Sequence, residues 1–157
     1  MKTYFNTADA QSAKLAEFYL TKDGRRFTML NATKFEATAN ISTADVKRLG
    51  CMITGKKPNG LEVKLTCTVY KCSSLFDDIV EEYKLTGVLP TFEVQVTSED
   101  KASTVGRDTK VYKGCVLDGD VLLNMFDAGG EFIEQEITAY AMDYESAEKY
   151  TEPDYMM

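Results

Sequence analysis

The sequence predicts a mainly β domain with one flanking α-helix, and two observations carry this prediction. Polar and apolar residues alternate along several short runs, as in strands with one buried and one wet face. Only one stretch, about residues 74–86, has apolar residues at helical spacing. With 157 residues the chain has the size of a single domain, residues 1–157.

The first strands are predicted on either side of an Asp-Gly turn. The runs Lys14 to Thr21 and Arg26 to Ala39 are rich in strand formers, and Lys22-Asp23-Gly24-Arg25 separates them. Asp and Gly tolerate the positive φ of a tight turn, so we expect a β-hairpin. The stretch Ala8 to Ala16 is compatible with a helical turn, and its composition leaves this open.

Residues 40–60 form the longest polar segment between the predicted strands. An extended run from Val46 to Ile53 is expected to divide this segment in two. Long loops inside a compact domain are usually functional or mobile. We therefore expect residues 40–60 to be an arm that contacts another subunit. A plain exposed loop is the alternative.

The run Leu61 to Tyr70 is predicted to be a strand, with Val63, Leu65, Cys67 and Val69 on one side and Glu62, Lys64, Thr66 and Thr68 on the other. A helix is predicted to follow from Ser73 to Gly87. Either Ser73 or Ser74 can cap this helix, Asp77 and Asp78 lie in its first turn, and Gly87 ends it. Its apolar stripe is expected to cover an open face or end of the sheet.

The remaining pattern brings the prediction to about eight strands. A turn over 117–120 is expected between two of them, and the tail 145–157 has no pattern and is expected to be flexible. These further strands are predicted over Thr91 to Thr97, Thr109 to Val116, Val121 to Met125 and Glu131 to Tyr144.

The charge balance argues against nucleic-acid recognition. A formal charge of −7 and a pI near 4.7 repel phosphate polyanions, although the excess could equally serve solubility alone. No apolar run approaches the length of a spanning helix, and Met1 to Asn6 lacks the apolar stretch of a signal peptide. We therefore expect a cytosolic protein without a membrane anchor.

The cysteines predict neither a metal site nor disulfides. The chain has four cysteines without a C-x-x-C pair, and it has no histidine. Cys67 and Cys115 lie in strand patterns and are expected to be reduced and buried, whereas Cys51 and Cys72 are left open. No cofactor is predicted.

Catalysis is not expected either. A Ser-His or Cys-His pair is impossible without histidine. The carboxylate pairs Glu134 with Glu136 and Asp118 with Asp120 are weak signals in an acidic chain. Asp118-Gly119-Asp120 lacks the later ligands of a calcium loop, and Gly55-Lys56-Lys57 lacks the upstream glycine of a phosphate-binding loop.

An ordered series of short motifs resembles the tail tube protein family of contractile-tailed phages, defective prophages and R-type bacteriocins. The similarity spans roughly Lys14 to Lys149. It departs from the family in a longer region from Thr21 to Ala39 and in the ending Tyr155-Met156-Met157. The motifs, in chain order, are Met52, Thr54-Gly55-Lys56-Lys57, Lys71-x-Ser73 before a helix, Gly87-x-x-Pro90-x-Phe92-x-x-x-Val96, Gly106-Arg107, Glu131-x-x-Glu134-Gln135-Glu136-Ile137 and Asp143-Tyr144.

The resemblance implies a β-sandwich or barrel-like subunit that forms homohexameric rings, which stack into the inner tube of a contractile tail. Strands would pair across subunits, which removes exposed sheet edges. The implied partners are further copies of the chain, a tail sheath protein, a tape measure protein, and a baseplate and tail terminator at the ends. DNA would pass through an acidic lumen without sticking, and the particle would assemble in the host cytoplasm.

The resemblance and the alternation together assign two sets of residues as hypotheses. Residues of the arm are expected to contact the next ring, and residues of wet strand faces are expected to line the lumen or the outer wall. The ring-contact set is Thr54, Gly55, Lys56, Lys57 and Asn59, and the lumen or wall set is Glu62, Lys64, Glu93, Gln95, Glu134 and Glu136.

Three alternatives remain from the sequence. A type VI secretion tube protein would share the architecture and differ in its partners. A monomeric β-domain that binds a peptide or glycan would stay monomeric at high concentration. An enzyme of unknown type would need a carboxylate with a strongly raised pKa in a pocket.

Overall fold

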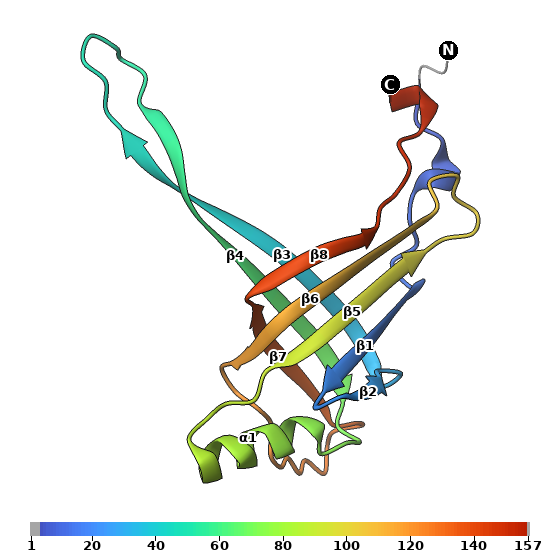
Figure 1. Cartoon of the computed structure of the whole chain (residues 1–157). Helices are drawn as coiled ribbons and strands as arrows, with labels where there is room; N and C mark the ends of the chain where they lie inside the picture. Colours follow the sequence, from blue (N-terminus) through green and yellow to red (C-terminus); the bar gives the residue numbers. More distant parts are fainter. Residues whose placement is uncertain (1–3, 157) are drawn as a thin grey trace. The chain divides into compact units, whose positions relative to one another are not determined.

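The computed structural model of the chain describes residues 4–156, so predictions that touch Met1–Thr3 and Met157 lie outside the described residues. A mainly β chain with one α-helix is confirmed (Figure 1). Two short 3-10 helices lie near the ends, at Thr7–Asp9 and Asp154–Met156. The other elements are β1 (Ala16–Lys22), β2 (Arg25–Thr28), β3 (Ala32–Val46), β4 (Gly55–Tyr70), α1 (Leu75–Thr86), β5 (Phe92–Glu99), β6 (Arg107–Asp118), β7 (Glu134–Ala141) and β8 (Asp143–Glu148).

The chain divides into two compact units. Unit 1 comprises the described parts of residues 1–31, 90–115 and 142–157, and unit 2 comprises residues 32–89 and 116–141. Strand β6 contributes Arg107 to Cys115 to unit 1 and Val116 to Asp118 to unit 2.

Unit 1 is an antiparallel sheet in the order β2-β1-β5-β6-β8. The predicted Asp-Gly hairpin turn is confirmed between β1 and β2, and Asp23 and Gly24 have φ values of 52° and 76°. The predicted run from Arg26 to Ala39 is not one strand, because β2 ends at Thr28 and β3 begins at Ala32 and pairs with β4. A bulge in β6 contains Gly114, whose φ of 63° suits glycine, and an added Cβ there would lie 3.2 Å from Met142 Cβ. The buried apolar side chains of these strands are Phe18, Leu20, Phe92, Val94, Tyr112 and Cys115.

Unit 2 is an antiparallel sheet in which the end of β6 is followed by β7, β4 and β3. The predicted alternation of β4 is confirmed, because Val63, Leu65, Cys67 and Val69 are all buried. Their partners on β7 include Ile137 and Ala139, which are also buried. This face forms the apolar side of the unit.

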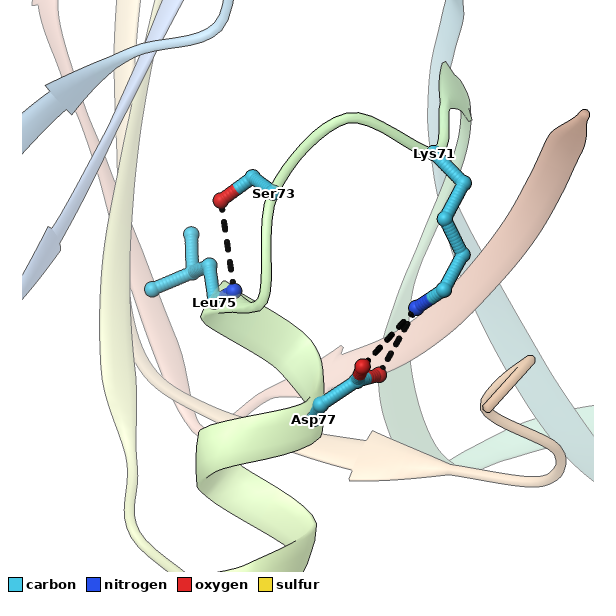
Figure 2. Close-up of polar contacts among 4 residues, drawn as sticks. All are labelled: Lys71, Ser73, Leu75 and Asp77. Carbon is cyan, nitrogen blue, oxygen red and sulfur yellow. Dashed lines mark hydrogen bonds and ion pairs between the residues drawn. The ribbon is translucent and has the colours of Figure 1, made fainter. Parts of the chain in front are cut away.

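The corner between β4 and α1 is fixed by polar contacts (Figure 2). The Lys71 ammonium donates to both carboxylate oxygens of Asp77, at 2.8 and 3.0 Å, and Ser73 Oγ accepts from the Leu75 amide at 3.3 Å. Ser74 holds the cap position, but its side chain makes no cap hydrogen bond. Gly87 ends the helix in the left-handed conformation, as predicted.

Several predicted boundaries are wrong. The run Val46 to Ile53 is not an extended segment, because β3 ends at Val46 and residues 47–54 form the loop of a hairpin. Val121 to Met125 is irregular rather than a strand. Strand formers become a strand only where a partner supplies backbone hydrogen bonds, and neither segment pairs with a strand among residues 4–156.

The predicted final strand from Glu131 to Tyr144 starts only at Glu134 and breaks at Met142. β8 then occupies Asp143–Glu148, so the start of the tail has a strand that the sequence pattern did not indicate. The expected flexibility of residues 145–157 stays a prediction.

All four cysteines are free, and Cys67 and Cys115 are buried as predicted, whereas Cys51 and Cys72 are exposed. Burial raises the pKa of the Cys67 thiol to about 11 and that of Cys115 to about 12. Both buried thiols are therefore protonated and unreactive near neutral pH.

Candidate assembly surfaces

The predicted arm, residues 40–60, is the distal half of the β3–β4 hairpin. β4 pairs with β3 from Gly55 to Val69, but it pairs with β7 only from Val63 to Tyr70. From Gly55 to Glu62, on the loop side of Val63, the hairpin is therefore a two-stranded ribbon that extends past the rest of unit 2 (Figure 1). Isolated two-stranded hairpins are only marginally stable, which favours a partner for this ribbon.

The five predicted ring-contact residues all lie on this arm. Thr54 belongs to its loop, Lys56 forms an ion pair with Asp45, and Lys57 is exposed. Asn59 lies opposite no residue of β3 in the strand register, because Ser42 faces Gly60 and the next residue, Thr43, faces Pro58. Gly55 starts β4 opposite Val46.

The tip of the arm carries exposed apolar side chains that the prediction did not include. Leu49 and Met52 are as exposed as in an extended chain, with 105% and 102% relative accessibility, and Ile53 is also largely exposed. Arg48 donates to the Ile53 carbonyl oxygen at 3.0 Å and holds the loop in shape. The tip thus combines apolar groups with basic ones.

The predicted lumen or wall residues of unit 2 share one face of its sheet. Thr68 faces Glu136, Tyr70 faces Glu134, and Asn40 faces Glu62 across the strands. This face is opposite the buried side chains of β4, and we call it the wet face. Its predicted members are Glu62, Lys64, Glu134 and Glu136.

The other two residues of that set, Glu93 and Gln95, lie on β5 in unit 1. Glu93 faces Thr21, and Gln95 faces Tyr19 and Val111. Glu93 is exposed and contributes to raising the pKa of Lys113, after the larger effect of the bond between Lys113 and Glu145.

A second exposed surface lies on the connection between β6 and β7, residues 119–133. Phe126 and Phe132 are 93% and 76% exposed, and Phe132 makes an edge-to-face contact with Tyr70 at 6.2 Å between ring centroids. Met125, Phe126, Phe132 and Ile133 line a cavity of about 450 Å³. The apolar run Val121 to Met125 is the sequence signal for this surface, although its pattern predicts an internal strand.

Unit 1 contains a polar cluster around Asp9 that sequence reasoning missed. Tyr155 donates to one carboxylate oxygen of Asp9 at 2.6 Å. The Thr104 amide and hydroxyl, both at 2.9 Å, and the Ser103 hydroxyl donate to the other. The bond from Tyr155, followed by that from the Thr104 amide, lowers the pKa of Asp9 to about 2.

The Asp9 cluster joins segments that are far apart in sequence, which is why no local motif revealed it. The cluster ties a segment near the N-terminus to the C-terminal tail and to the loop between β5 and β6. The Thr151 amide adds a bond to the Val105 carbonyl oxygen at 2.8 Å.

Within residues 4–156, no group of three or more acidic or cysteine side chains is arranged to hold a metal ion. None of the helices in this part of the chain is long and apolar enough to cross a membrane.

Solved structures show which fold this is. The chain superposes with a TM-score of 0.61 and 13% identity on a chain of the PVC sheath-tube complex of an extracellular contractile injection system, covering 91% of this chain and 98% of that one. A chain of the anti-feeding prophage baseplate gives a TM-score of 0.58 with 10% identity, covering 93% and 97%. The fold is that of tail tube proteins.

The sequence comparisons show the family. The family described as "Phage tail tube protein" matches residues 3–148, so the chain belongs to the phage tail tube protein family. Phage-like element PBSX protein XkdM of Bacillus subtilis (strain 168) is 27% identical over 135 residues, covering 83% of this chain and 91% of that protein. The chain is a structural protein of a phage or phage-like tail.

Proposed function

We propose that copies of this chain form homohexameric rings that stack into the inner tube of a contractile tail, with the arm making the contact between rings. The observation that carries the proposal is the ribbon beyond Val63, which leaves the sheet of its own unit. Its apolar tip is exposed, and another copy of the chain would cover both the tip and the edges of the ribbon.

The sheet edges support assembly of the same kind. Among the described residues, β3 is the last strand in the sheet order of unit 2, so it is an edge strand. Pairing these edges between copies closes the ring and removes a site of uncontrolled aggregation. The solved structures that share the fold include a gene transfer agent tail with C6 symmetry, with a TM-score of 0.52 and 15% identity.

The tube would meet other proteins along its wall and at its ends. Solved complexes with this fold include a sheath-tube complex, a baseplate, and a tube-terminating cap. We infer that this chain is surrounded by a sheath protein, encloses a tape measure protein during assembly in the host cytoplasm, and ends at a baseplate and a terminator. It has no catalytic role, and its lumen conducts DNA or another cargo without binding it.

The experiment shortens the arm without disturbing the sheet. Ser42 and Gly60 face each other across the hairpin, so residues 43–59 can be replaced by the two-residue turn Asn-Gly. We expect the shortened chain to fold, with a melting temperature close to that of the full chain, and to give subunits or single rings but no tubes in electron micrographs.

Two results would contradict the proposal at different levels. Tubes of normal length from the shortened chain would show that the arm is dispensable for stacking. A full-length chain that stays monomeric by light scattering at every concentration would instead favour the monomeric β-domain and end the tube proposal.

A further inference from the structure

We propose that the arm of one copy docks on the β6–β7 connection, residues 119–133, of a neighbouring copy. This inference rests on the tube assembly proposed above and names the surface that receives the arm. Both surfaces belong to unit 2, and both carry largely exposed apolar side chains.

The arm offers an apolar tip with a basic surround. Leu49 and Met52 are fully exposed at the tip. The arm contains the basic residues Lys47, Arg48, Lys56 and Lys57 and the single acid Asp45, so its net charge is +3. Such a surface is complementary to an apolar surface with acidic residues around it.

The β6–β7 connection has that chemistry. Its cavity of about 450 Å³ is lined by Phe126, Phe132 and other apolar side chains. The connection contains Asp120, Asp127 and Glu131 and no basic residue, so its net charge is −3. The charges of the two surfaces are equal and opposite, although the whole chain is acidic.

The backbone of the connection is also open to a partner. Among the described residues, none of the backbone hydrogen bonds involves Val121 to Phe126. Backbone groups removed from water need partners, and an extended segment with free N–H and C=O groups can pair with a strand from another chain.

A buried acceptor points to the same place. The Gln135 side chain is 5% exposed, and its Oε1 has no hydrogen-bond partner within residues 4–156. Gln135 lines a second cavity of about 480 Å³, whose other walls are residues 120–125 and the start of β7. An unpaired buried acceptor is costly, so a donor supplied by the docked arm would stabilise the contact.

The occupant must come from another copy because of where the two surfaces lie. The arm loop meets β4 at Gly55, whereas the connection meets β7 at Glu134, which faces Tyr70 at the other end of β4. The 16 residues of β4 span roughly 50 Å, and Figure 1 shows the arm and the β4–α1 corner at opposite ends of unit 2. The contact is therefore head-to-tail, and such contacts repeat along an axis.

A cross-link tests the contact directly, because the arm already carries the exposed Cys51. Ala128→Cys places a thiol in the wall of the receiving cavity, and Cys72→Ser removes the other exposed thiol. Oxidation of assembled tubes with copper phenanthroline should give a ladder of disulfide-linked multimers on a non-reducing gel. The ladder should be absent in the same chain with Cys51→Ser, and in a chain with Lys101→Cys in place of Ala128→Cys.

A charge exchange tests the complementarity. Lys47→Glu with Lys57→Glu should raise the concentration needed for tube formation about tenfold or more, because like charges then face each other across the contact. Asp120→Lys with Glu131→Lys should do the same, and all four changes in one chain should restore assembly. Lys101→Glu, on an exposed loop of unit 1, is the charge control and should have little effect.

The outcomes separate this inference from the proposed function. Two results would overturn the arm–connection contact and leave the tube proposal standing. One is that assembled tubes give no ladder of Cys51 cross-links, and the other is that the four charge changes combined in one chain do not restore assembly. A wild-type chain that forms no tubes would overturn both.

Discussion

At the scale of single residues, Asp9 is the centre of a hydrogen-bonded cluster in unit 1. Its carboxylate accepts hydrogen bonds from Tyr155, Thr104 and Ser103 and thereby holds the C-terminal tail on unit 1. The ionised form makes these bonds, which is why the pKa of Asp9 is lowered from 3.8 to about 2.

We expect the tail to loosen in acid. Because the folded-state pKa of Asp9 lies below its unfolded value, the stabilisation is complete above about pH 4 to 5 and is lost as the pH falls through about 2. Asp9→Asn should remove this pH dependence and loosen the tail at neutral pH, since the charged acceptor is gone. Hydrogen exchange of residues 150–156 between pH 2 and 7 measures both effects.

Tyr155→Phe is the matched control for the same residues, because it deletes only one donor to Asp9. It should loosen the tail less than Asp9→Asn does. Equal protection of the tail in all three proteins across the pH range would show that Asp9 does not hold it.

The local part of the fold could be predicted from the sequence because its causes are local. The Asp23-Gly24 turn, the alternation of β4 and the helix stop at Gly87 each follow from the preferences of neighbouring residues. The Asp9 cluster could not be predicted, because Asp9 lies more than 90 positions in sequence from each of its partners Ser103, Thr104 and Tyr155. The predicted ring-contact residues do not include the exposed Leu49 and Met52, because the sequence pattern predicts an extended run from Val46 to Ile53 where the structure has a loop.

At the scale of the elements, α1 depends on its apolar stripe and on the β4–α1 corner. Ile79 is completely buried, whereas Leu85 on the same helix is 83% exposed. The ion pair between Lys71 and Asp77, two partly buried side chains, fixes the start of the helix. The Lys71-x-Ser73 motif therefore contributes to local structure, because Lys71 pairs with Asp77 and Ser73 bonds the Leu75 amide at the start of α1.

We expect Ile79→Ala to destabilise the protein by about 2–5 kcal/mol, the usual cost of a cavity left by a buried aliphatic side chain. Leu85→Ala is the control on the same helix and should change the free energy of unfolding by less than about 0.5 kcal/mol. Urea unfolding monitored by circular dichroism compares the two. Similar losses in both variants would show that the buried stripe is not what holds α1.

At the scale of the whole molecule, we propose that the charge of the wet face sets how the assembled tube treats DNA. The chain carries a net charge of −7, and on the wet face of unit 2 the acids outnumber the bases: it carries Glu36, Glu62, Glu134 and Glu136 beside Lys34 and Lys64. Phosphate binding gains free energy from the release of counterions by basic groups, which a carboxylate surface cannot provide. Wild-type tubes should therefore not retain DNA even at low salt.

We expect Glu134→Lys with Glu136→Lys to make the tubes retain DNA, because the two changes take the net charge from −7 to −3 and place lysines on the wet face. Retention should fall steeply with added salt. Glu81→Lys with Glu152→Lys makes the same change of charge at two exposed positions off this face and is the control.

Co-sedimentation with the tubes compares a linear duplex shorter than the roughly 150 bp persistence length with a closed plasmid circle. If the wet face lines the lumen, only the linear duplex should be retained, since a closed circle cannot thread a tube. Retention of both would place the wet face on the outer wall, and retention of neither would show that Glu134 and Glu136 are covered in the assembled tube.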